Sequence, residues 1–68
     1  MEISYNKLWK VLIDKNMKKI DLKDLAGISS SSLAKLGKNE PVTLEVLMKI
    51  CEALDVNIGD IIEFIKKV

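Results

Sequence analysis

Apolar residues recur at helical spacing through most of this 68-residue chain. Near its start, Tyr5, Leu8, Trp9, Leu12 and Ile13 follow the i, i+3, i+4, i+7, i+8 spacing of a single helix face. This pattern predicts a first helix that runs to about residue 15. The same pattern makes the only tryptophan a core anchor rather than a platform on which bases stack.

Two short amphipathic segments follow and flank Gly27. Their apolar positions are Leu22, Leu25 and Ala26 in the first segment and Leu33, Ala34 and Leu36 in the second. Gly27 adopts a positive φ at little steric cost, and Ile28 is apolar enough to fill the angle between two helices. Ser29 has a hydroxyl that accepts a backbone N–H and so caps the helix that follows. Two helices joined by a short turn that contains glycine form a helix-turn-helix.

The second half of the chain predicts two more helices. Thr43 caps the fourth, which we expect to run to about Leu54. Asn57 and Asp60 have the three-residue spacing of a capping box, so they open a fifth helix that reaches about Lys66. The pattern as a whole predicts an all-α fold of five helices, organised as a single domain over residues 1–68.

Composition narrows the possible functions. Cys51 is the only cysteine, so an intrachain disulfide is impossible, which fits a reducing compartment. The absence of histidine excludes catalysis by histidine and metal sites with histidine ligands. No paired-carboxylate motif, glycine-rich phosphate loop, signal peptide or membrane-length apolar run is present. We therefore expect a cytoplasmic protein that is not an enzyme and that has no membrane, metal, cofactor or small-molecule ligand.

Charge is unevenly distributed although the net charge is only +1. Residues 7–38 hold eight lysines and three acidic residues, a net charge of +5, whereas residues 39–68 hold three lysines and six acidic residues, a net charge of −3. Such asymmetry favours approach of a nucleic acid to the basic part. All eleven cations are lysines, so the chain lacks the bidentate arginine fork that most often reads guanine.

The order Leu22, then residues 25–29, then Leu33 and Leu36 resembles the phage repressor/Cro-type (lambda-repressor-like) family of helix-turn-helix DNA-binding domains. Residues 43–61 are similar to the closing helices of that domain, so the resemblance spans nearly the whole chain. It implies a compact five-helix fold whose second and third helices form the helix-turn-helix, with the third helix in the major groove. Gly37, which we expect to end that helix as its C′ residue, departs from the acidic residue that the family often has there.

The resemblance also assigns a DNA-binding surface. The face of the third helix opposite its leucines would read bases with Ser30, Ser31 and Lys35, because recognition helices meet base edges near their N-terminal end. Phosphates would be bound by Lys19, Lys23, Ser32, Lys38 and Asn39. An alternative is that residues 29–32 form a flexible serine linker, but the flanking apolar residues keep helical register across them.

The expected fifth helix carries more apolar surface than one packing face requires. Ile58, Ile61, Ile62 and Ile65 share a face, and Phe64 and Val68 widen it. The surplus fits a dimer seam at Ile61, Phe64 and Val68, because related domains often pair through this end. It fits equally the packing of the chain end onto the first helix.

These features together predict a sequence-specific regulator of transcription that binds double-stranded DNA, as a homodimer, and acts by occupying its site. The alternative is a protein-interaction module or antitoxin-like adaptor that reuses the same fold. The near-neutral net charge and the lack of arginine favour this alternative.

Overall fold

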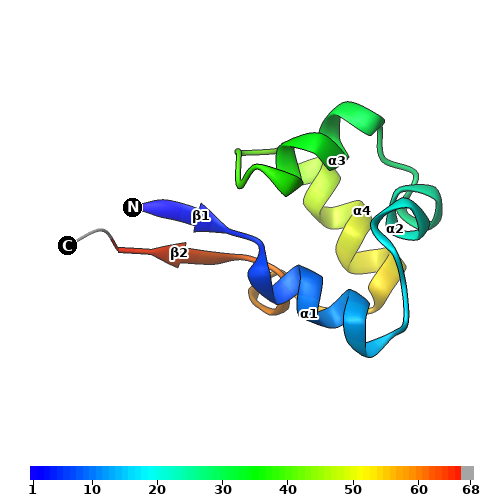
Figure 1. The fold of residues 1–68 in the computed structure, drawn as a ribbon. Helices are drawn as coiled ribbons and strands as arrows, with labels where there is room; N and C mark the ends of the chain where they lie inside the picture. Colours follow the sequence, from blue (N-terminus) through cyan, green and yellow to red (C-terminus); the bar gives the residue numbers. More distant parts are fainter. Residues whose placement is uncertain (67–68) are drawn as a thin grey trace.

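The computed structural model describes residues 1–66, which form four α-helices, one short 3-10 helix and two strands. In chain order these are β1 (Glu2–Ser4), α1 (Asn6–Asp14), α2 (Lys19–Ala26), α3 (Ser30–Gly37), α4 (Leu44–Leu54), the 3-10 helix η1 (Ile58–Asp60) and β2 (Glu63–Ile65). Figure 1 shows the helices gathered together, while the two strands run side by side away from them, with the N-terminus at the outer end of β1. None of the described helices has the length and apolar character needed to cross a bilayer.

The first four helices lie where the sequence pattern predicts them. Asn16 follows α1 with φ of 56°, the left-handed conformation that asparagine tolerates at a helix end. The Ser29 hydroxyl accepts the N–H of Ser32 at 3.1 Å and caps α3, and Thr43 Oγ1 accepts the N–H of Val46 at 3.2 Å and caps α4. Local capping chemistry therefore sets where both helices begin.

The predicted fifth helix is wrong, and with it the all-α, five-helix fold. The expected capping contact does form, because Asn57 N–H donates to Asp60 Oδ2 at 2.9 Å, but it opens only η1. The chain then extends into β2, which pairs antiparallel with β1 so that Ile3 lies opposite Phe64. β-branched isoleucines favour extended backbone, and β1 supplies hydrogen-bonding partners from the far end of the sequence. The fold is mostly helical, with four helices and a small two-stranded sheet.

The end of α3 also differs from expectation. Gly37 is the last helical residue rather than a left-handed C′ residue, and the left-handed conformation falls on Asn39, with φ of 56°. The carbonyl of Lys35 accepts the N–H of Lys38 at 3.1 Å and that of Glu40 at 2.9 Å. The free carbonyls of the last turn are thus partly satisfied by a turn that asparagine closes, so glycine is not required there.

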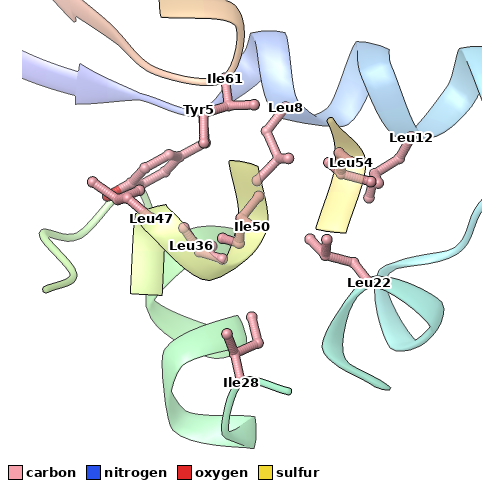
Figure 2. Packing of buried hydrophobic residues seen from close by; sticks show 10 residues of the cluster. All are labelled: Tyr5, Leu8, Leu12, Leu22, Ile28, Leu36, Leu47, Ile50, Leu54 and Ile61. Atoms are coloured by element: carbon pink, nitrogen blue, oxygen red, sulfur yellow. The ribbon is translucent and has the colours of Figure 1, made fainter. Parts of the chain in front are cut away.

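A single hydrophobic core lies between the helices and the base of the strand pair. Its ten buried apolar residues are Tyr5, Leu8, Leu12, Leu22, Ile28, Leu36, Leu47, Ile50, Leu54 and Ile61. Figure 2 shows these side chains converging on α4. The expected apolar stripes are wider than this core, since Ile13, Leu25, Leu44 and Met48 remain exposed. Trp9, the expected core anchor, is partly buried and packs against the core, and so does Cys51.

Tyr5 connects the start of α1 to the loop after α3. Its side chain is 1% exposed, and its hydroxyl donates to the carbonyl oxygen of Glu40 at 2.8 Å. Its backbone N–H donates to Asn39 Oδ1 at 3.2 Å. Burial raises the pKa of the Tyr5 hydroxyl, and the backbone of Val42 acts in the opposite direction. Two hydrogen bonds therefore hold the loop at residues 39–40 against the core.

Replacing Tyr5 with phenylalanine removes one of these bonds and leaves the carbonyl of Glu40 without that donor. We expect the free energy of unfolding at neutral pH to fall by about 1 kcal/mol. In the wild type the folded-state pKa lies above the ordinary 10.0, so the neutral hydroxyl stabilises the fold fully below that pH. This stabilisation is lost as pH rises through the raised pKa. Urea unfolding of both proteins across this alkaline range measures the difference.

The same experiment has an internal check, because Tyr5 is the only tyrosine. Its phenolate absorbance therefore reports one group, and Tyr5→Phe corrects the unfolding data for deprotonation of lysines in the same pH range. A phenolate that forms at or below the ordinary tyrosine pKa would contradict the buried, hydrogen-bonded hydroxyl.

Candidate nucleic-acid interface

The turn between α2 and α3 has the conformation that the sequence predicts. Gly27 is left-handed, with φ of 68° and ψ of 36°, and its N–H donates to the carbonyl of Lys23 at 3.0 Å. Ile28 follows and is buried, 6% exposed, within the core. Ser29 is extended and begins α3. The left-handed glycine lets the chain change direction sharply between the two helices, so α2 and α3 form a helix-turn-helix.

The helix α3 has one buried and one exposed side. Leu36 is 0% exposed and Leu33 is half-buried. Ser30, Ser31 and Lys35 are exposed, so the three predicted base-reading residues share the side that faces solvent. Because the leucines fix the rotation of the helix, these polar side chains have a defined direction relative to the core.

The serines at the start of α3 are not equivalent. Ser29 Oγ donates to Ser32 Oγ at 3.1 Å and also lies 3.2 Å from Ser31 Oγ. Either hydroxyl can be the donor in the contact between Ser29 and Ser31. Ser31 is thus engaged in the capping cluster, whereas Ser30 has no hydrogen-bond partner among the described residues and can both donate and accept. This distinction arises from the capping geometry, which a pattern of serines does not reveal.

The three lysines predicted to bind phosphates lie on α2 and directly after α3. Lys19 on α2 and Lys38 after α3 are exposed, while Lys23 on α2 is half-buried. Within residues 1–66 the structure records one ion pair, between Lys49 Nζ and Glu45 Oε1 on α4 at 3.6 Å. These lysines thus hold their charge without a carboxylate partner in the described part of the chain.

Asn39, the other predicted phosphate-binding residue of this loop, is oriented by Tyr5. Its Oδ1 accepts the Tyr5 N–H, so its amide NH₂ group is the end left for an acceptor from outside. An amide NH₂ group is a suitable donor to a phosphate oxygen. The contact that orients Asn39 joins residues 34 positions apart and leaves no local pattern in the sequence.

The N-terminus of α2 also has donors left for an acceptor from outside the chain. The N–H of Lys18 donates to Asp21 Oδ2 at 2.8 Å, but no partner among the described residues accepts the N–H groups of Lys19 and Ile20. Free N–H groups at a helix N-terminus favour an anion. Lys19 belongs to the same turn, and its Nζ lies 4.5 Å from the centroid of the Trp9 ring, a contact that sequence reasoning missed.

The three predicted seam residues fall in different environments. Ile61 is 0% exposed and belongs to the core, so as a surface residue of a seam it is wrong. Its burial follows from the turn after η1, which directs the side chain inward as the chain enters β2. Phe64 lies on β2 and is 63% exposed. Val68 lies outside the described residues.

Comparison with known proteins adds two findings. The family model of the Cro/C1-type HTH DNA-binding domain matches residues 7–67. A crystal structure of the transcriptional regulator VanUg (Form II) is similar to this chain, with 60% sequence identity and a TM-score of 0.88. The match covers 91% of this chain and 83% of that one. A search of curated protein sequences found no match.

The capping role of Ser29 predicts a measurable loss of stability. Ser29→Ala removes the acceptor of the Ser32 N–H, and we expect the free energy of unfolding to fall by about 1 kcal/mol. Thr43→Ala removes the equivalent cap of α4 and serves as the matched control, with a similar expected loss. Thermal or urea unfolding checks both. A loss for Thr43→Ala with none for Ser29→Ala would show that the serine cap does not form in solution.

Proposed function

The chain belongs to the Cro/C1-type helix-turn-helix DNA-binding family, and we propose that it is a sequence-specific regulator of transcription that binds double-stranded DNA as a homodimer. The observation that carries the proposal is the exposed polar side of α3, which lies opposite the buried Leu36. Lysines on α2 and in the loop after α3 have no carboxylate partner within residues 1–66. Short polar side chains beside free cations are suited to a surface that approaches both base edges and phosphates.

In this proposal α3 enters the major groove with its N-terminal end toward the bases. Ser30 would donate or accept a hydrogen bond, and Lys35 would donate to the acceptors of guanine or to a phosphate. Ser31, whose hydroxyl contacts that of Ser29, would donate to or accept from a base edge. Serine makes single hydrogen bonds, so discrimination by each of these contacts is weaker than by a bidentate arginine or asparagine.

The remaining predicted residues would bind phosphates on either side of the groove. Lys19 and Lys23 come from α2, Ser32 from α3, and Lys38 and Asn39 from the loop after α3. Each phosphate that a lysine neutralises adds about 0.9 to the slope of log affinity against log salt concentration. The proposal therefore makes salt dependence a direct count of the lysine contacts.

The homodimer is proposed at the strand pair. In the described residues β2 pairs only with β1, so its other edge is free, and its Phe64 and Ile65 are exposed. A free edge that carries large apolar side chains favours association with another chain. A two-fold dimer would present two copies of α3 to half-sites about 34 Å apart, a length comparable to the 36 Å long dimension of one subunit.

A protein-interaction module remains the second candidate, and one observation favours it. Leu25 on α2 and Leu44 and Met48 on α4 are exposed apolar residues that the core does not use. Binding to random duplex DNA at low salt distinguishes the candidates, because a DNA-binding regulator should be retained there and released at high salt. An interaction module would show neither retention nor release.

Lys35 and Lys19 should differ in what they contribute to DNA binding. We expect Lys35→Ala to weaken binding to the preferred site more than to random DNA, because a base contact is lost. Lys19→Ala should weaken both alike and lower the salt slope by about 0.9, because only a phosphate contact is lost. Fluorescence anisotropy on both duplexes over a salt series measures this. Equal losses on both duplexes for Lys35→Ala would remove its base-reading role.

Phe64 should control assembly. Phe64→Glu places a charge on the exposed face of β2 and should shift the sedimentation of the folded protein from dimer to monomer. Met48 is equally exposed, 63% for each side chain, and lies on α4, so Met48→Glu is the matched control that should leave the dimer intact. If Met48→Glu dissociates the protein and Phe64→Glu does not, the seam is on the helices instead.

A further inference from the structure

We infer that Trp9 is a positioning residue for Lys19: the indole ring holds the lysine ammonium beside the N-terminus of α2, where the phosphate of a bound duplex would arrive. The inference rests on the proposed DNA-binding function and extends it to a residue that would itself touch no DNA. It arises from the one cation–aromatic contact recorded among the described residues, between Lys19 Nζ and the Trp9 ring.

The geometry of this contact fits an attractive interaction. The distance of 4.5 Å from nitrogen to ring centroid lies well inside the roughly 6 Å over which a ring face attracts a cation, and tryptophan is the strongest such ring. Trp9 is partly buried and packs against the core, so its ring is a fixed surface rather than a mobile one. Lys19 is exposed and has no acidic partner in residues 1–66, so no ion pair competes for its ammonium.

The contact lies beside the first turn of α2. An open, mainly apolar hollow of about 270 Å³ lies at the junction of α1 and α2, lined by Trp9, Leu12, Ile13, Met17, Lys18 and Lys19. The free N–H groups of Lys19 and Ile20 belong to the first turn of α2 beside it. A phosphate at this helix end would meet the backbone donors and the ammonium together.

The ring affects binding by limiting where the ammonium can be before DNA arrives. A free lysine side chain samples many rotamers, and fixing it on a phosphate costs conformational entropy. The ring restricts that sampling in the unbound protein, so less entropy is lost on binding. An ammonium carries three N–H donors, and a ring face occupies only the side turned toward it, so donors remain for the phosphate.

Lys23 provides the internal comparison. It lies one helical turn further along α2 and is also a proposed phosphate ligand, but no aromatic ring contacts it in the described residues. Removal of the Trp9 ring should therefore alter the contribution of Lys19 and leave that of Lys23 unchanged.

The test is a set of double-mutant cycles on duplex binding. Trp9→Leu should weaken binding about two- to fivefold, and Trp9→Phe, which keeps a weaker ring face, should weaken it less. In a Lys19→Gln background the Trp9 substitutions should have no further effect, whereas in a Lys23→Gln background they should keep their full effect. Trp9→Phe preserves most of the packing, so the cycle remains usable if Trp9→Leu fails to fold. Equal losses in all backgrounds would overturn the inference and leave the proposed function intact.

A second measurement needs no DNA. A side chain held over an indole face has its ε-methylene protons shifted upfield by the ring current, so the NMR signals of Lys19 should be shifted in the folded wild type. The signals of Lys23 should not be shifted, and those of Lys19 should return to ordinary values in Trp9→Phe or Trp9→Leu to the extent that the contact weakens. Unshifted Lys19 signals overturn the inference whatever the protein binds. Shifted signals in a protein that binds no duplex at low salt overturn the proposed function, and the phosphate-positioning role with it.

Discussion

The burial of Leu36 and Ile28 in the hydrophobic core is the constraint on which the candidate interface depends. These two side chains fix the rotation of α3 and its angle to α2, and every exposed residue of α3 takes its direction from them. Deletion of a buried leucine side chain typically costs about 2–5 kcal/mol, a large fraction of the stability of a domain this small. The polar side of α3 is therefore held in place by side chains that the core buries.

The features that sequence predicts well are the ones whose causes are local. Helical periodicity placed α1 to α4, and single side chains placed their ends: Ser29 and Thr43 by capping, Gly27 by its left-handed conformation. The side of α3 that carries Ser30, Ser31 and Lys35 could also be predicted, because Leu33 and Leu36 define the opposite side. Each of these signals lies within one helical turn of the residue that it positions.

The features that sequence missed have partners far along the chain. The stretch after Asn57 has helical spacing of isoleucines, but its backbone pairs with residues 2–4, which helical periodicity within one segment does not detect. The same reasoning applies to Asn39, whose conformation and orientation depend on Tyr5, and to Lys19, which contacts Trp9 from the neighbouring helix. Apolar stripes also overestimate burial, as Leu44 and Met48 show, because a small core cannot cover every apolar residue of four helices.

The distribution of charge and the strand pair lead to one conclusion about how such a protein would bind. The cations near α3 are few and all are lysines, each of which offers a phosphate a point charge rather than a bidentate fork. One subunit can therefore gain only modest affinity and modest base discrimination from its contacts. Figure 1 shows that the strands extend away from the helices. In the proposed dimer, joining two subunits at β2 would make the second half-site an intramolecular contact, which would raise affinity without any new residue at the DNA surface. In this arrangement specificity depends on the distance between the two copies of α3 as much as on the serines of either one.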